Sequence, residues 1–337
     1  MSELNKIALK ILSNGKGILA ADESTATMTK RLESVNVKST ANSRLLFRET
    51  LFSSSSIKEC IGGVILYDET IRQKTSSGKT IPELISSNGS ITGIKVDTGA
   101  KVLAGSQDEK ITEGLDGLRE RLEEYYKLGA RFTKWRGVYM ITDNYPTKLS
   151  ISSNAHALAR YAALVQEARM VPIIEPEVLM DGSHSAKTCL IKTSEVIKKC
   201  YEELELNNVD LTGTILKPNM ILPGANSNEK ISNEEIAELT LDCLKKCVPS
   251  EVPGIAFLSG GQSEIEATVN LNHINNKNDT NFIMTYSYGR ALQQSALKFW
   301  AQDLNNKIGT QEIFDHRAKM CTLAAQGKWS ENLENSK

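Results

Sequence analysis

The chain has 337 residues, 40% of them hydrophobic and 24% charged, and its 40 basic and 41 acidic residues leave a formal net charge of −1. This composition is typical of a folded globular protein, and without any basic stripe or arginine-rich tract it disfavours a nucleic-acid-binding role. No run approaches the roughly 18 apolar residues that a membrane-spanning helix requires. We therefore expect neither a membrane nor a nucleic acid among the partners.

The N-terminal residues 1–12 have the spacing of an amphipathic helix and too few apolar residues for a signal peptide. The six cysteines are scattered and none forms a C-x-x-C pair, which is typical of free thiols in a reducing compartment. The four histidines lie far apart in the sequence, which disfavours a histidine-built metal site. We therefore predict a cytoplasmic protein without a bound metal.

Eight short runs of apolar or β-branched residues follow along the chain, and each of them stops at a polar residue. Helical patterns lie between them, for example over 114–126, where leucines recur at helical spacing, and from 232 onwards, where a capping box begins another helix. Two domains would also fit this length, but strands alternating with helices favour a single (β/α)8 TIM barrel domain over 1–337. Within it we expect a short N-terminal helix and a polar C-terminal tail after Trp329. The predicted strands are 17–22, 63–68, 93–97, 132–141, 171–177, 213–217, 254–259 and 281–286.

Charged residues gather where several of these strands end. Side chains two residues apart on a strand share a face, and three strand ends carry a charged pair at that spacing. One such pair is usually a solvated strand tip, whereas several of them indicate a site, because barrel enzymes assemble their catalytic groups at the carboxyl ends of the strands. The residues are Asp22, Lys95, Asp97, Lys134, Arg136, Glu175, Glu177 and Lys217.

Lys217 is the most informative of these residues because it interrupts the apolar run 213–220 just before a proline. A buried ammonium group is costly unless it loses its proton or finds partners, and an uncharged lysine forms imines with carbonyl substrates. Like-charge repulsion from Lys134 would favour the uncharged form, and Glu175 could move protons during imine formation and dehydration. The alternative is that Lys217 ends its strand and simply reaches solvent or an ion pair.

Two loops late in the chain predict a phosphate site. The run 254–259 leads into Ser-Gly-Gly-Gln and the run 281–286 into Ser-Tyr-Gly-Arg, and a helical stretch follows each. Glycines let backbone N–H groups approach a phosphate, an arginine binds its oxygens in a forked geometry, and barrels often bind phosphate at these loops. Hydroxyls and cations over 24–31 could hold a second anion, although an ordinary helix cap would also explain them.

These features predict a phosphorylated carbonyl substrate, with a phosphate at each end, that is cleaved by a retro-aldol reaction. A protonated imine withdraws electrons strongly enough to let a neighbouring C–C bond break, so this chemistry needs no metal.

Seven motifs, taken together, resemble class I fructose-bisphosphate aldolase of the eukaryotic type. They follow one another in order and with matching spacing over about 15–327, so the resemblance is highly specific. The motifs are GILAADEST around Asp22, GIKVD around Lys95, KWR from Lys134, PIIEPE around Glu175, LKPNM around Lys217, FLSGGQS around Ser259 and SYGRALQ from Ser287.

The resemblance implies a lyase that reversibly cleaves fructose 1,6-bisphosphate to dihydroxyacetone phosphate and glyceraldehyde 3-phosphate in glycolysis and gluconeogenesis. It implies a cytosolic homotetramer that uses no cofactor. Lys217 matches the Schiff-base lysine of the family, and Glu175 matches its general acid and base. Lys134 matches the lysine that stabilises the carbinolamine. Asp22 and Glu177 match carboxylates that position the nucleophile and belong to the proton network.

The substrate-binding residues are implied in the same way. Four residues match the family's pocket for the phosphate of the dihydroxyacetone end, namely Ser259, Gly260, Gly289 and Arg290. Ser287 is a further substrate-binding residue. The residues that match contacts to the rest of the substrate and its other phosphate are Ser24, Thr27, Arg31, Arg44, Lys95 and Arg136.

Three features depart from the family pattern. Ala26 and Thr27 stand where the family commonly has glycine and serine, so phosphate affinity is expected to shift there, and Thr98 stands where relatives often carry a lysine. Family members usually end in a flexible tail whose terminal tyrosine helps protonate the enamine, whereas no tyrosine follows Tyr288 here. Either another group or water protonates the enamine, or the native tail is missing from this sequence; without the tail we expect slower turnover of the bisphosphate with imine formation intact.

Two alternatives stay open. A Schiff-base aldolase of other specificity, such as a transaldolase or a deoxyribose-phosphate aldolase, is disfavoured because a monophosphate needs only one anion site. A scaffold or adaptor that binds actin or an adhesin is disfavoured as the only role by Lys217, Glu175 and Lys134, but it could accompany catalysis.

Overall fold

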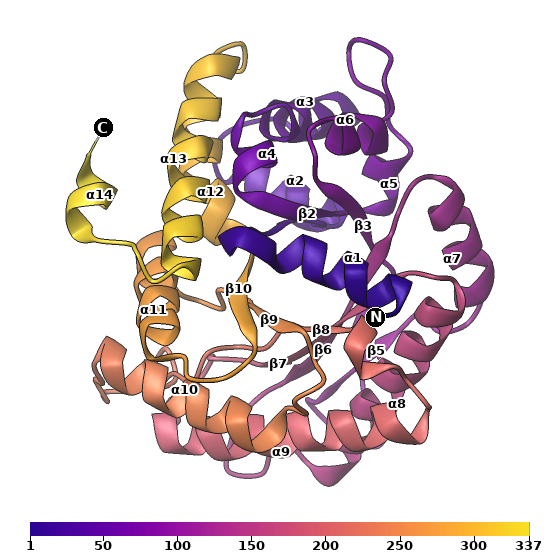
Figure 1. Ribbon diagram of the computed structural model, residues 1–337, viewed down its shortest axis with the longest axis vertical. Helices are drawn as coiled ribbons and strands as arrows, with labels where there is room; N and C mark the ends of the chain where they lie inside the picture. The colour runs from indigo at the N-terminus through magenta and orange to yellow at the C-terminus, as the bar shows by residue number, and fades with distance from the viewer. Residues whose placement is uncertain (337) are drawn as a thin grey trace.

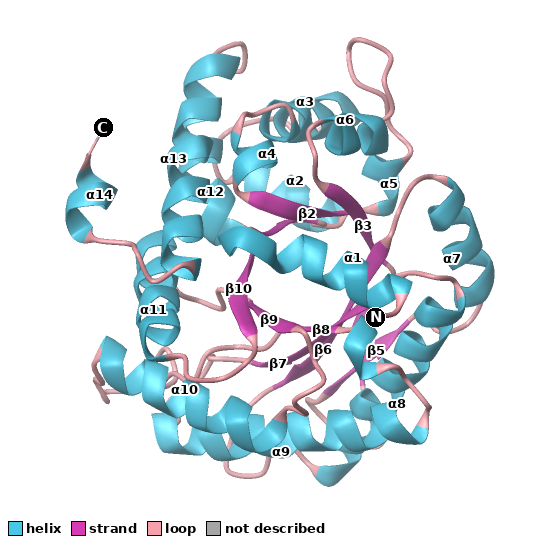
Figure 2. Cartoon of the chain, in the orientation of Figure 1, coloured by secondary structure: helices cyan, strands magenta, loops and turns pink. Residues whose placement is uncertain are grey.

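The computed structural model describes residues 1–336, and its central feature is a closed barrel of parallel strands surrounded by helices (Figure 1; Figure 2). Around the barrel the strands follow the order β1-β10-β9-β8-β7-β6-β3-β2, and each neighbouring pair is parallel. The predicted (β/α)8 barrel is thus confirmed. Its strands are β1 (Gly17–Ala21), β2 (Ile61–Leu66), β3 (Ile91–Lys95), β6 (Phe132–Tyr139), β7 (Val171–Val178), β8 (Ile215–Leu216), β9 (Gly254–Phe257) and β10 (Ile283–Tyr288).

Most of the helices connect consecutive strands and cover the outside of the barrel (Figure 2). Both segments that helical patterning indicated in the sequence contain a helix, as α10 and as α7, which begins at Leu118 and not at Gly114 because Gly117 has a left-handed backbone. The helices are α1 (Glu3–Leu12), α2 (Thr25–Glu33), α3 (Ala41–Phe52), α4 (Ser56–Glu59), α5 (Asp68–Ile71), α6 (Ile81–Ser87), α7 (Leu118–Lys127), α8 (Lys148–Glu167), α9 (Ala186–Leu206), α10 (Asn233–Cys247), α11 (Glu264–Lys277), α12 (Arg290–Trp300), α13 (Lys307–Ala325) and α14 (Glu331–Asn335), with 3-10 turns at Ser13–Gly15 and Leu211–Gly213.

The helix α1 closes the amino end of the barrel. It lies across the strands in Figure 1, and its apolar face packs on the interior cluster that contains Ile18, Ile65 and Phe132. The approach is close at Gly62, where an added Cβ would stand 1.8 Å from the backbone oxygen of Ile11. With its amino end closed by α1, the barrel is accessible at its carboxyl end.

The strand β8 is short because Pro218 follows Lys217, whose backbone N–H is the last to donate a strand hydrogen bond. The backbone N–H of Lys217 still donates to the carbonyl of Ile174 on β7 (2.8 Å), whereas Pro218 has no N–H, and its carbonyl accepts from Leu258 (3.0 Å). Lys217 therefore stands at the carboxyl end of β8, where its backbone is bonded to β7 and the next carbonyl to the residue that follows β9.

An antiparallel hairpin that the sequence did not indicate lies between β3 and β6. It consists of β4 (Gly99–Val102) and β5 (Lys110–Glu113). The Thr112 hydroxyl donates to the carbonyl of Arg136 (2.6 Å), and Asn154 of α8 bonds to the backbone of Lys110 and Thr112. The hairpin is thereby fixed beside the carboxyl ends of β3 and β6.

The polar segment after Trp329 contains the short helix α14, which is fastened to α13. Glu334 accepts from Arg317 (2.8 Å) and from the indole N–H of Trp329 (2.8 Å). Among residues 1–336, no helix combines the length and the apolar character needed to cross a bilayer.

Candidate active site

A cavity of about 820 Å³ opens at the carboxyl ends of the barrel strands. Its wall brings together residues that are up to 274 positions apart in the sequence, from Ala20 to Gln294. Every site residue predicted from the sequence lines it except Arg44. These residues are Asp22, Ser24, Thr27, Arg31, Lys95, Lys134, Arg136, Glu175, Glu177, Lys217, Ser259, Gly260, Ser287, Gly289 and Arg290.

Lys217 lies inside this cavity and not at a solvated strand tip. Its side-chain Nζ is 3.0 Å from Oε1 of Glu175, and each of the two residues is only 4% exposed. Of the alternatives left open by the sequence, solvent exposure is therefore wrong, and an ion pair is what the structure contains. A proton on Lys217 has an acceptor within hydrogen-bond distance.

Lys134 is the centre of the ionic network. Its Nζ lies 2.9 Å from Asp22, 3.3 Å from Glu175 and 3.9 Å from Asp97. Burial alone would lower the pKa of Lys134, but these three carboxylates outweigh it and hold the pKa well above its ordinary value. Lys134 is therefore a permanent cation next to the Lys217–Glu175 pair.

The carboxylates respond to the same charges. Burial alone would raise the pKa of Asp22, but the charges of Lys134 and Lys217 lower it from 3.8 to about 2. Burial acts in the same direction on Glu175, and the neighbouring Lys134, Lys217 and Arg136 again reverse it, so the pKa of Glu175 lies below its ordinary value. Both groups are carboxylates at neutral pH, and Glu175 is ready to accept a proton.

Two cations predicted to meet the second phosphate are already paired. Arg136 forms an ion pair with Glu177, and Lys95 pairs with the carboxylate of Asp97 while also donating to its carbonyl (2.8 Å). Inside the cavity, lysine and arginine charges are thus largely balanced by carboxylates.

The loops after β9 and β10 meet at one end of the cavity. Arg290, the first residue of α12, donates to the carbonyl of Gly260 (3.0 Å) and so ties the two loops together. Gly260 has a φ of +57°, which an L side chain rarely adopts, and an added Cβ at Gly289 would lie 3.3 Å from the carbonyl oxygen of Ala20. The hydroxyl of Ser287 is buried and has no hydrogen-bond partner within residues 1–336. Backbone N–H groups, a free hydroxyl and a guanidinium here suit a phosphate.

In the second predicted anion region, 24–31, the same residues cap a helix and line the cavity. The Ser24 side chain accepts the N–H of Thr27 (3.3 Å), and its oxygen lies 3.1 Å from the Thr27 hydroxyl, so Ser24 does cap α2. Arg31 pairs with Glu23, while its Nε and one Nη are buried without a partner in the described chain. These uncommitted donors are available to an anionic ligand.

Arg44 does not line the cavity. It lies on α3, where it forms an ion pair with Glu69 and also donates to the hydroxyl of Ser39 (3.0 Å). Its guanidinium is thus committed on the outer side of the site, and we assign it no substrate contact.

Several cavity residues carried no predicted role. Asp97 was recognised only as half of a charged pair and Lys30 only as one of the cations of the predicted anion region 24–31, while Glu23 and Tyr67 received no assignment. Their places in the sequence could have indicated that they line the cavity. Tyr67 directly follows β2 at the carboxyl end of the barrel, and Glu23 and Lys30 belong to the same segment as Asp22 and Arg31.

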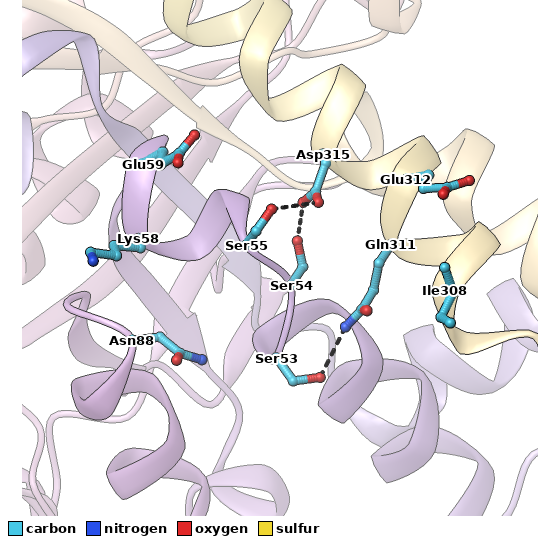
Figure 3. A pocket seen from close by; sticks show the side chains of 10 residues that line it. All are labelled: Ser53, Ser54, Ser55, Lys58, Glu59, Asn88, Ile308, Gln311, Glu312 and Asp315. Atoms are coloured by element: carbon cyan, nitrogen blue, oxygen red, sulfur yellow. Dashed lines mark hydrogen bonds between the residues drawn. The ribbon is translucent and has the colours of Figure 1, made fainter.

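A second groove, of about 470 Å³, lies between α13 and the segment around α4 (Figure 3). Some of its polar groups bond to one another: the hydroxyl of Ser55 donates to Asp315 (2.8 Å), and the Gln311 amide donates to the hydroxyl of Ser53 (3.1 Å). No predicted site residue lines it. Within residues 1–336, no group of three or more His, Cys, Asp or Glu side chains is arranged to hold a metal ion.

Comparison with known proteins extends over nearly the whole chain. Residues 3–337 match the family described as fructose-bisphosphate aldolase class-I. A probable fructose-bisphosphate aldolase class 1 of Xanthomonas axonopodis is 48% identical over 98% of this chain and 99% of its own length. The cytosolic fructose-bisphosphate aldolase 5 of Arabidopsis thaliana is 50% identical over 97% of this chain and 92% of its own. A solved structure of fructose-bisphosphate aldolase from Plasmodium falciparum, in complex with TRAP and a small-molecule inhibitor, superposes with a TM-score of 0.96 at 44% identity and covers 97% of this chain and 95% of its own.

Proposed function

The chain belongs to the class I fructose-bisphosphate aldolase family, and we propose that Lys217 is the residue on which it forms its imine. It is a lyase that reversibly cleaves fructose 1,6-bisphosphate to dihydroxyacetone phosphate and glyceraldehyde 3-phosphate in glycolysis and gluconeogenesis, through a Schiff base. The observation that carries the assignment of Lys217 is its buried contact with Glu175 at 3.0 Å.

Imine formation begins when Lys217 transfers its proton to Glu175. The freed amine attacks the C2 carbonyl of the substrate, and the ammonium group of Lys134 stabilises the oxygen anion that develops. A proton then passes from the newly bonded nitrogen to this oxygen to give the carbinolamine, and Glu175 returns its proton to the C2 hydroxyl, which leaves as water and gives the protonated imine. The lowered pKa of Glu175 keeps it in the carboxylate form, so its oxygens are free to accept a proton, and the persistent charge of Lys134 supports its electrostatic role.

Cleavage reuses the same carboxylate. Glu175 removes the proton of the C4 hydroxyl, the C3–C4 bond breaks, and its electrons move into the imine to form an enamine, which frees glyceraldehyde 3-phosphate. Protonation of the enamine and hydrolysis release dihydroxyacetone phosphate and restore Lys217. Asp22 and Glu177 act as positioning carboxylates, since they hold Lys134 and Arg136 in place.

The two phosphates bind at separate parts of the cavity in this proposal. Ser259, Gly260, Ser287, Gly289 and Arg290 hold the phosphate of the dihydroxyacetone end. The other phosphate is bound by the remaining cavity residues of the predicted set, which are Ser24, Thr27, Arg31, Lys95 and Arg136.

The substrate of the family is a phosphorylated sugar, and we extend three further properties of the family to this chain. The reaction is metal-independent, because a protonated imine already serves as the electron sink. The enzyme is a cytoplasmic homotetramer, in line with its cytosolic relatives. As a second role it binds a cytoskeletal or adhesin partner, for which the Plasmodium structure solved with TRAP is the supporting observation. Size-exclusion chromatography with light scattering tests the tetramer.

Borohydride trapping tests the assignment of Lys217. Reduction in the presence of dihydroxyacetone phosphate should attach the reduced three-carbon adduct to the peptide that contains Lys217, and Lys217→Met should abolish both the adduct and cleavage. An adduct on Lys134 or Lys95 in its place would refute the proposed nucleophile.

Chelation tests the proposal that the reaction needs no metal. Activity should be unchanged after dialysis against EDTA. A loss of activity that added divalent metal restores would show a metal-dependent mechanism.

A further inference from the structure

Tyr67 lies in the cavity wall without a role in the reaction described above. It directly follows β2, where Leu66 pairs with Ala21 on β1 and with Ile94 on β3. One residue further along, Tyr67 is therefore level with Asp22 on one side and Lys95 on the other.

The side chain of Tyr67 belongs to the inward face of the barrel. The backbone is still extended at this residue (φ −97°, ψ 157°), so the alternation of the strand continues to it. Ile65, two positions earlier, belongs to the interior barrel cluster. Tyr67 continues that face into the cavity.

The hydroxyl of Tyr67 is uncommitted. The hydroxyls of Tyr125, Tyr286 and Tyr288 each donate to an acceptor elsewhere in the chain, at 2.7 to 2.9 Å. That of Tyr67 has no hydrogen-bond partner in the part of the chain that the structure describes, although the residue is half-buried in the cavity wall. A phenol that lines a substrate cavity and bonds to no protein group is a donor available to a ligand.

Its place in the barrel indicates which part of the substrate it meets. Along the closed sheet, β2 is separated from β8 by β3, β6 and β7, so Tyr67 and Lys217 stand on opposite sides. Tyr67 is thus remote from the imine carbon. It is near the side with Lys95, where the cation is engaged by Asp97. A neutral hydroxyl can donate to a phosphate oxygen there without breaking an ion pair.

We propose that the Tyr67 hydroxyl binds the phosphate remote from the imine and so contributes to the preference for bisphosphates over monophosphates. This inference rests on the proposed function, in which Lys217 forms the imine and the second phosphate lies on the β1–β3 side.

Tyr67→Phe tests the inference because it removes one oxygen atom and keeps the ring. KM for fructose 1,6-bisphosphate should rise about ten- to a hundredfold, as expected for loss of one hydrogen bond to a charged group, with kcat unchanged. KM for fructose 1-phosphate, which lacks the remote phosphate, should not change. Tyr126→Phe is the matched control, since that ring lies between Arg131 and Arg169, outside the cavity.

Binding measured without turnover separates this inference from the proposed function. A non-cleavable hexitol bisphosphate should bind Tyr67→Phe more weakly than the wild type by the same factor, while hexitol 1-phosphate should bind both equally, whether or not Lys217 is the nucleophile. Equal affinities for the bisphosphate, or an equal loss for both ligands, would overturn the role of Tyr67. Trapping of dihydroxyacetone phosphate at another lysine would overturn the proposed nucleophile alone.

Discussion

Asp22 shows how a single carboxylate links catalysis to stability. It directly follows β1, and its carboxylate is the one nearest to the Lys134 ammonium group, at 2.9 Å. This contact fixes the position of the Lys134 cation in the cavity. Both partners are largely buried. Removing Asp22 takes away the nearest of the three carboxylates that compensate the buried charge of Lys134.

We predict that Asp22→Asn lowers the free energy of unfolding in a pH-dependent way. The folded-state pKa of Asp22 is depressed from 3.8 to about 2, and at about 1.4 kcal/mol per pKa unit this corresponds to roughly 2 kcal/mol. Because the folded pKa is the lower one, the stabilisation is fully present well above pH 3.8 and is lost as the pH falls toward 2. Urea unfolding of both proteins from pH 7 to pH 3 should show a difference that shrinks below about pH 4. The exposed Asp108→Asn serves as control, and a difference that stays constant with pH would contradict the prediction.

At the scale of residues, the sequence predicted positions better than partners. Strand alternation nominated Lys134 and Glu175, and the interruption of an apolar run nominated Lys217, because the carboxyl ends of all barrel strands meet at one end of the barrel. It could not indicate that Arg44 pairs with Glu69. The guanidinium of a long side chain can reach partners on several elements, and only the packing of α3 against the start of α5 decides between them.

The amino end of the barrel depends on a contact between two elements, α1 and β2. The backbone of Ile11 lies so close to Gly62 that only a residue without Cβ fits. The spacing lets α1 bury Ile11 and Leu12 against the strands. The helix thus completes the core on the side opposite the cavity.

We predict that Gly62→Ala lowers the free energy of unfolding by about 1–3 kcal/mol, the usual cost of overpacking a core. Its Cβ would meet backbone and not the movable end of a side chain. Because the change lies at the amino end of the barrel, kcat and KM should be those of the wild type at a temperature where the variant is folded. In the control Gly137→Ala, the nearest atoms to the new Cβ are 3.5 Å away, and stability should change much less. Equal stability of the two variants would show that α1 moves freely.

Elements with an apolar run were predictable from the sequence, and the others were not. The eight barrel strands are largely buried and therefore rich in branched apolar residues. The strands β4 and β5 have four residues each, are mostly exposed and contain no such run. The hairpin is defined by tertiary contacts such as that of Thr112 with the carbonyl of Arg136, which no local pattern reveals.

For the whole molecule, a net charge of −1 provides no long-range attraction for an anionic substrate. Inside the cavity, Lys95, Lys134, Arg136 and Lys217 are each paired with a carboxylate. Lys30 and Arg290 also line it, and neither forms an ion pair within residues 1–336. Attraction of the phosphates is therefore local and comes from a few uncompensated cations in the wall.

We predict that KM for fructose 1,6-bisphosphate rises by about two- to fivefold between 50 and 500 mM NaCl, because salt screens the exposed part of this attraction. The value of kcat should change little, since the buried pairs around Lys217 are screened much less than exposed charges. Fructose 1-phosphate carries a single phosphate and should show a smaller rise in KM when both substrates are assayed across the same salt series. The variant Arg290→Gln should have a higher KM and a weaker salt dependence for both. If the two substrates responded to salt equally in the wild type, the remote phosphate would contribute no electrostatic attraction, and the division of the cavity into two anion sites would be wrong.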